Sequence, residues 1–171
     1  MDLEKFIRTV PDFPIKGINF YDITTLFENI TTFNYIIKLL FERYKSEKID
    51  KVVGIEARGF MLGAALAYKL NVGFVPIRKK GKLPYKTISE TYSLEYGEDT
   101  VEIHIDAIQK NQNILLVDDL IATGGTANAS TKLINNLDGI IKECCFIIDL
   151  PELGGSNDLK QNGLDVFSIL S

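Results

Sequence analysis

The stretch of residues 114–130 constrains the fold more than any other part of the chain. It begins with four apolar residues, 114–117, of the kind expected for a strand buried on both faces of a parallel sheet. Two acids, Asp118 and Asp119, end this run, and a loop of small residues and a segment of helical composition follow. A buried strand, a short loop and a helix in this order predict an α/β fold whose ligands bind beyond the carboxyl ends of the strands.

The loop after the two acids has the chemistry of a phosphate site. Small residues let the backbone approach a ligand closely, and the free N–H groups of a helix N-terminus attract anions. The motif is not a nucleotide-binding P-loop, because that motif has Lys and then Ser or Thr after its second glycine, whereas Thr126 and Ala127 follow Gly125 here. It also lacks the GxGxxG spacing of a dinucleotide-binding fingerprint. An ordinary strand–turn–helix junction is the alternative, although it leaves the coincidence of acids, hydroxyls and glycines unexplained. The expected phosphate-binding residues are Ala122, Thr123, Gly124, Gly125 and Thr126.

Two further segments carry charge that would suit a polyanion. Arg58 follows a predicted strand on a turn that opens a helix, a position that suits a diphosphate. Residues 78–82 place four cations within five positions after another predicted strand. Each feature alone is more often a solvated surface group. At the carboxyl edge of one sheet, however, both would offset the charge of the same ligand.

Composition limits the class of protein. With 171 residues, 46% hydrophobic and 25% charged, the chain is expected to form one globular domain, 1–171. The net charge of −4 argues against broad nucleic-acid binding, and no apolar run is long enough for a membrane span. The adjacent Cys144 and Cys145 lie in an apolar run, which suits buried, reduced thiols. With no secretory signal at the N-terminus, we expect a cytoplasmic protein.

The predicted elements alternate between strands and helices, which indicates a doubly wound, mostly parallel α/β sheet of about five strands. A short amphipathic helix is expected at 1–9 and an irregular segment at 11–24. Residues 85–93 are interpreted as an unpatterned mobile lid, and His104 as a solvent-facing strand residue. No element is assigned to the Gly/Asn-rich residues 152–164. Strands are expected at 51–56, 72–77, 114–117, 140–150 and 166–170, helices at 31–45, 60–70 and 127–137, and a hairpin at 92–96 and 100–105.

The strand, acid pair and Thr/Gly loop resemble the signature of the type I phosphoribosyltransferases, which bind 5-phosphoribosyl 1-pyrophosphate (PRPP). The resemblance implies that Asp118 and Asp119 face the ribose hydroxyls and that residues 122–126 hold the 5′-phosphate. Residues 54–60, GIEARGF, resemble the family's pyrophosphate loop, in which a peptide bond is often cis. The run RKxGKLP resembles a further diphosphate motif and allows one cation to act across a homodimer interface. The pyrophosphate-binding residues implied in this way are Ala57, Arg58, Gly59, Arg78 and Lys82.

Two other segments resemble the adenine-specific members of that family. Residues 11–24, PDFPxxGIxFxDIT, resemble a hood over the base, with the whole hood segment at 1–30. By this match Asn19, Phe20 and Tyr21 bind adenine, and Phe20 stacks on it. Tyr21 replaces the usual Lys or Arg and Thr25 the usual Pro, which affects fine specificity.

Residues 94–97, LEYG, resemble the catalytic loop of the same enzymes, within a flexible loop and hairpin at 78–105. The match implies that Glu95 acts on the purine and that Tyr96 packs in the lid near the substrates. The reaction implied is adenine plus PRPP to AMP plus pyrophosphate, in purine salvage, with Mg²⁺ carried by PRPP and no metal ligand from the protein. The alternatives are another purine base (hypoxanthine, guanine or xanthine) and a PRPP-sensing regulator without turnover.

Overall fold

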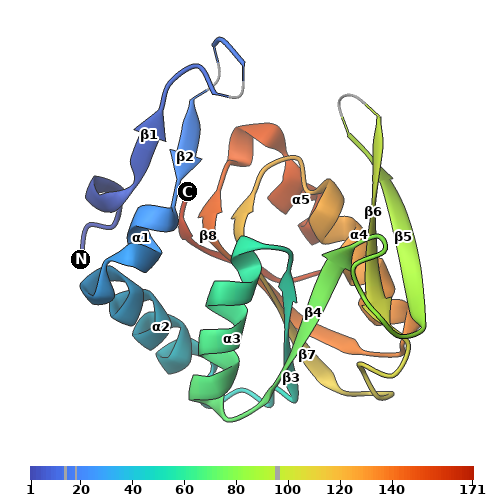
Figure 1. The fold of residues 1–171 in the computed structure, drawn as a ribbon. Coiled ribbons are helices and arrows are strands. Elements are labelled where there is room, and N and C mark those ends of the chain that lie inside the picture. Colours follow the sequence, from blue (N-terminus) through green and yellow to red (C-terminus); the bar gives the residue numbers. More distant parts are fainter. Residues whose placement is uncertain (14, 18, 95–96) are drawn as a thin grey trace.

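The computed structural model describes residues 1–13, 15–17, 19–94 and 97–171. A seven-stranded sheet with the order β5-β6-β4-β3-β7-β8-β9 forms its centre, and β1 and β2 pair separately (Figure 1). The strands are β1 (Arg8–Val10), β2 (Phe20–Asp22), β3 (Lys51–Ile55), β4 (Gly73–Lys79), β5 (Thr87–Ser93), β6 (Glu98–His104), β7 (Asn113–Ile121), β8 (Ile140–Asp149) and β9 (Val166–Leu170). The helices are α1 (Thr24–Glu28), α2 (Ile30–Tyr44), α3 (Arg58–Leu70), α4 (Gly125–Asn136) and α5 (Gly155–Gln161), with 3₁₀ turns η1 (Glu4–Phe6) and η2 (Pro151–Leu153).

The five strands from β4 to β9 in this order are parallel, which confirms the predicted fold class. Strand β7 lies at the middle and pairs with β3 on one side and β8 on the other. Its residues alternate between two cores, because successive strand side chains point to opposite faces. Ile114 and Leu116 pack toward α4 and α5, whereas Leu115 and Val117 pack toward α2 and α3.

The predicted helices at 31–45, 60–70 and 127–137 are confirmed, with ends shifted by one or two residues. Helix α2 begins where expected because the Asn29 side chain accepts hydrogen bonds from the N–H groups of Thr31 and Thr32. The free thiols of Cys144 and Cys145 are buried, as predicted. No helix in the described ranges has both the length and the apolar composition to cross a membrane.

The N-terminal prediction was wrong in part. Residues 1–9 do not form an amphipathic helix but the turn η1 and strand β1, and the expected irregular segment contains β2. The two strands pair antiparallel, with Val10 opposite Phe20 and Arg8 opposite Asp22. They form a small ribbon that stands beyond the main sheet (Figure 1).

The segment 85–93 was also misread, since β5 begins at Thr87 and pairs with β6 along its whole length. Strand β5 therefore ends at Ser93 and β6 begins at Glu98, whereas the sequence predicted the connection at 97–99. The hairpin extends the main sheet through β6 and β4 instead of hanging from it as a separate lid. Only one face of β5 packs on α4, so few of its residues are apolar. The alternation of apolar and polar residues along this strand is therefore weak in the sequence.

Two smaller corrections concern His104 and the C-terminal segment. His104 is half-buried rather than solvent-facing: its ring lies 6.2 Å from that of Tyr85, and its Nε2 atom has no hydrogen-bond partner among the described residues. Residues 152–164 contain helix α5, which is short and polar and is held mainly by the buried Leu159. A single apolar anchor gives no helical periodicity in the sequence.

Candidate active site

A cleft of about 470 Å³ opens at the carboxyl ends of β3 and β7. The β5–β6 hairpin stands on one side of this edge and the β1–β2 ribbon on the other (Figure 1). Because parallel strands end together at one edge, residues distant in the sequence meet there. The cleft is lined by Ile55, Glu56, Ala57, Arg58, Lys79, Tyr92, Leu94, Asp99, Val101, Asp118, Asp119, Leu120 and Thr126.

The predicted phosphate loop forms a smaller cavity of about 140 Å³ beside this cleft, lined by residues 118, 120–127. Gly124 has a φ of +80°, which glycine adopts without strain, and α4 begins at the next residue. The free N–H groups at the start of α4 therefore face the loop, as the sequence predicts.

Gly155, a residue that the sequence reasoning missed, shapes this loop from behind. Its N–H donates to the carbonyl oxygen of Ala122 at 3.0 Å. A Cβ on Gly155 would overlap that oxygen and lie 2.8 Å from the Cα of Gly124. The signal available in the sequence was a second Gly-Gly pair, 154–155, after strand β8.

Tyr92 was a second omission, and it joins the hairpin to the phosphate loop. The Thr126 hydroxyl donates to the Tyr92 hydroxyl at 2.9 Å, and the Tyr92 ring leaves only 3.0 Å for a Cβ on Gly125. The Tyr92 hydroxyl in turn donates to Asp99 at 3.4 Å. Burial of the Tyr92 hydroxyl raises its pKa, so the phenol stays protonated. Thr123, by contrast, is exposed at the loop tip.

The acid pair lies at the floor of the cleft. Asp119 is buried and forms an ion pair with Arg58, while Asp118 is half-buried and accepts a hydrogen bond from the Asp119 N–H at 2.8 Å. Burial, together with the neighbouring negative charge of Asp119, raises the pKa of Asp118 well above its usual value. The two acids are therefore inequivalent, because among the described residues Asp119 pairs directly with a cation and Asp118 does not.

The predicted diphosphate loop is built at the end of β3. The peptide bond between Glu56 and Ala57 is cis, as the resemblance implies, and α3 begins at Arg58. Gly59 is buried against the end of β7, where its missing side chain leaves room for Asp118. The three residues predicted at this loop thus lie together in the cleft or directly behind it.

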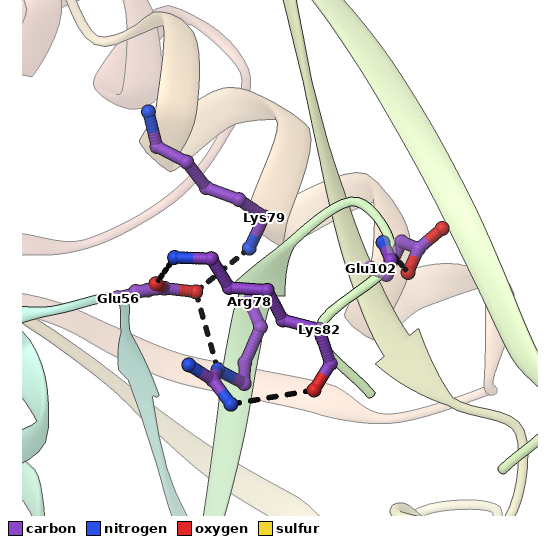
Figure 2. A network of polar contacts seen from close by, with 6 residues as sticks. Glu56, Arg78, Lys79, Lys82 and Glu102 are labelled. Carbon is purple, nitrogen blue, oxygen red and sulfur yellow. Dashed lines mark hydrogen bonds and ion pairs between the residues drawn. The ribbon is translucent and has the colours of Figure 1, made fainter. Parts of the chain in front are cut away.

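Glu56, in this loop, binds three residues of the basic run 78–82 (Figure 2). Its carboxylate accepts hydrogen bonds from Arg78 Nε at 3.2 Å, from the Lys79 backbone N–H at 2.9 Å and from Lys82 Nζ. Burial alone would raise the pKa of Glu56, but these donors outweigh it and lower the pKa. Arg78 and Lys82 are therefore held at this loop by the carboxylate of Glu56, which the sequence reasoning did not single out.

The side chain of Lys79 turns away from Glu56 and lines the cleft itself. Its Nζ forms an ion pair with Asp99 at 2.9 Å, which raises the pKa of Lys79 and lowers that of Asp99. Lys79 is thus a cation of the cleft that the motif match passed over. The sequence held a signal for this, because successive side chains of a strand point to opposite faces. Lys79 must therefore point to the opposite face of β4 from Arg78.

The predicted base-binding residues lie on β2 and just before it. The Phe20 ring packs edge-on against Phe13 with centroids 5.2 Å apart, and the Arg58 guanidinium lies 5.7 Å from the Phe20 centroid. Phe20 therefore lies beside Arg58, which lines the cleft. Asn19 is exposed, and the Tyr21 side chain lines a different cavity, behind the ribbon. Glu95 and Tyr96, predicted as catalytic and lid residues, lie outside the described residues.

Comparison with known proteins defines the class. Residues 23–162 match the model of the phosphoribosyl transferase domain, so the chain belongs to the phosphoribosyltransferase family. Among curated relatives, the adenine phosphoribosyltransferase of Ruegeria pomeroyi is 58% identical over 98% of this chain and 93% of its own length. That of Nitrosomonas europaea is 54% identical over 100% and 98%. Within the family, the chain belongs to the adenine phosphoribosyltransferases.

Solved structures agree. The crystal structure of adenine phosphoribosyltransferase from Thermoanaerobacter pseudethanolicus matches with a TM-score of 0.93 and 47% identity, over 99% of this chain and 97% of that one. The Saccharomyces cerevisiae enzyme, crystallised with adenine and an imino-altritol bisphosphate, matches with a TM-score of 0.92 and 40% identity, over 99% and 97%.

Proposed function

We propose that this protein transfers the phosphoribosyl group of PRPP to N9 of adenine, releasing pyrophosphate and forming AMP in purine salvage. The observation that carries the proposal is the convergence of three motifs on one cleft: the acid pair, the phosphate loop and the Arg58 loop. The Trypanosoma brucei relative, 30% identical, was crystallised with AMP, pyrophosphate and ribose-5-phosphate.

The cleft suits a reaction that separates charge. The phosphate loop would hold the 5′-phosphate at the N-terminus of α4. Arg58 and Lys79 would bind the diphosphate as it leaves, with Arg78 and Lys82 beside them. As the C1–oxygen bond breaks, the ribose becomes electron-poor, and the acids at the cleft floor would stabilise the positive charge.

Mg²⁺ fits this cleft as a companion of the substrate. Within the described ranges, no group of three or more His, Cys, Asp or Glu side chains could hold a metal. Hard cations prefer oxygen ligands, and PRPP supplies them on its diphosphate. When bound, Mg²⁺ would neutralise part of the leaving group's charge, while Arg58 and Lys79 complete that neutralisation.

Glu95 is proposed to exchange a proton with the purine ring, and Phe20 to stack on that ring. The position of Phe20 beside Arg58, which lines the cleft, supports this role. Attack through N9 shifts charge onto the purine ring, which must exchange a proton at another nitrogen. The base in AMP carries one ring proton fewer than free adenine, so a proton leaves the ring, and the Glu95 carboxylate could accept it if closure over the base desolvates that carboxylate.

A homodimer is proposed, and helix α3 offers a surface for it. Met61, Ala64 and Tyr68 recur at helical spacing on its outer face and are exposed, with Tyr68 88% exposed. Large apolar groups in such a stripe mark an interaction surface. The helix begins at Arg58, so pairing through this face would bring two active sites near each other. Sedimentation of the wild type and of Tyr68→Glu tests this: a dimer that the substitution dissociates is expected, and a monomer of full activity would contradict it.

One assay separates the proposed activity from its rivals. Pyrophosphate release is measured with PRPP, Mg²⁺ and each of adenine, hypoxanthine, guanine and xanthine. Release with adenine alone is expected. Release with another base instead would reassign the substrate, and PRPP binding without release with any base would indicate a regulator.

The cytoplasm is the proposed location, in keeping with the buried free thiols.

A further inference from the structure

A second cavity, of about 370 Å³, lies behind the β1–β2 ribbon. It is open to solvent on one side and is lined by the N-terminal segment, β2 and the carboxyl ends of β8 and β9, close to the point marked C in Figure 1. It shares no lining residue with the active-site cleft. The residues that line it are Glu4, Ile7, Thr9, Tyr21, Ile148, Asp149, Leu150, Leu170 and Ser171.

Asp149 is the group in this cavity that calls for a ligand. It is the last residue of β8 and is only 7% exposed. Its Oδ1 atom is buried and has no hydrogen-bond partner among the residues that the structure describes. A buried carboxylate oxygen without a hydrogen bond is costly, so such atoms are normally matched by a cation or by donors.

The remaining lining residues indicate which cation would fit. Glu4 adds a second acidic side chain, and no Lys or Arg is among the described residues that line the cavity. Two carboxylates are too few for the metal sites that proteins usually build, and the described residues form no cluster of three metal-binding side chains here. The walls are instead apolar, from Ile7, Ile148 and Leu170, and the Tyr21 ring can contact a positive charge. An ammonium group on a short aliphatic chain matches both the acids and the walls.

The cavity is joined mechanically to the proposed base site through β2. Successive residues of a strand point to opposite faces. Phe20 lies beside Arg58, whereas Tyr21 lines the cavity behind the ribbon. A ligand packed against Tyr21 would therefore also affect the position of Phe20, the neighbouring residue of β2.

We infer that the cavity behind the ribbon is a binding site for a primary alkylammonium ion, which pairs with Asp149 and sets the position of Phe20 over the base. The binding site stands on the cavity itself. Its effect on the base rests on the proposed function.

The binding arm uses n-butylammonium chloride as the probe and calorimetry or ligand-observed NMR as the readout, on the full chain at constant ionic strength. Saturable one-to-one binding is expected for the wild type, at least tenfold weaker binding for Asp149→Asn, and unchanged binding for the control Glu28→Gln. Glu28 is an exposed acid at the end of α1 that does not line the cavity. No saturable binding to the wild type, or equal binding to Asp149→Asn, would overturn the site.

A second measurement keeps the inference open to refutation if Asp149→Asn fails to fold. Wild-type protein is titrated with n-butanol, which has the same chain but no charge. At least tenfold weaker binding than that of n-butylammonium is expected. Equal binding would show that the cavity takes apolar chains without regard to charge.

The kinetic arm measures the KM for adenine with and without saturating n-butylammonium, against sodium chloride as the control salt. At least a twofold change in the KM for adenine is expected, with the KM for PRPP unchanged. A KM for adenine that does not respond would overturn the link to Phe20. If the proposed function fails instead, adenine gives no release of pyrophosphate, while the binding measurements still test the site.

Discussion

Gly59 and Asp118 are packed so closely that no side chain fits between them. A Cβ on Gly59 would lie 2.8 Å from Asp118 Oδ1 and 3.0 Å from the carbonyl oxygen of Val117. The first turn of α3 therefore lies directly on the end of β7. This contact fixes the diphosphate loop and the acid pair relative to each other.

Gly59→Ala should accordingly damage the site. The new methyl group must displace backbone at the end of β7, and such overpacking costs about 1–3 kcal/mol. We expect a loss of that size in urea unfolding and at least a tenfold weaker affinity for PRPP by calorimetry. Gly73→Ala is the control, because a Cβ there meets only Lys51 side-chain atoms at 3.8 Å or more. Equal behaviour of the two variants would contradict the assignment.

Gly125→Val tests the phosphate loop. A Cβ at this position already lies 3.0 Å from the Tyr92 ring, so a branched side chain would push the hairpin and the loop apart. At least a tenfold weaker affinity for PRPP is expected by calorimetry, because the start of α4 no longer reaches the phosphate. An unchanged affinity would remove residues 122–126 from the site.

Phe20→Ala tests base stacking. Aromatic pairs contribute on the order of 1 kcal/mol beyond the area they bury, so the KM for adenine should rise several-fold. The KM for PRPP should change less, since Phe20 lies on the ribbon and not on the phosphate loop. Steady-state kinetics with each substrate varied decides the matter; equal effects on both constants would mean that Phe20 only supports the ribbon.

Glu95→Leu tests the proposed proton transfer between the purine and Glu95. If Glu95 serves the purine, the substitution should lower kcat by a factor on the order of 10² to 10⁴ and leave PRPP affinity nearly intact. Glu98→Leu is the matched control, an exposed acid at the start of β6. Equal losses in both variants, or none in either, would assign the hairpin turn to exclusion of water alone.

Asp118→Asn tests the electrostatics of the cleft floor. Because burial and Asp119 raise the pKa of Asp118, the folded protein binds a proton that the unfolded chain releases at lower pH. This proton stabilises the fold at low pH, and the contribution is lost as pH rises from the ordinary Asp pKa through the raised one. The Asn variant should lack that decline, so urea unfolding between pH 4 and 8 should show it relatively more stable at neutral pH. The exposed Asp106→Asn should keep the wild-type slope.

Much of the fold and site could be predicted because the signals were local. A buried run ending in Asp118 and Asp119, or a helix capped by Asn29, is specified by a few adjacent residues. Helix α5 and strand β5 could not be predicted in this way, since Leu159 alone anchors the first and only one face of the second packs on α4. The contacts of Tyr92, Glu56 and Gly155 could not be predicted either, because each depends on which distant segment of the chain the fold brings next to that residue.

The contact between Gly155 and the phosphate loop also has a consequence for synthesis of the chain. Ribosomes make residues 122–126 well before residue 155, yet the loop backbone rests on Gly155 through the Ala122 carbonyl. A nascent chain stopped between these points would contain every residue of the phosphate loop without the support that shapes it. Capacity to bind PRPP should therefore arise late in translation, only after α5 has docked.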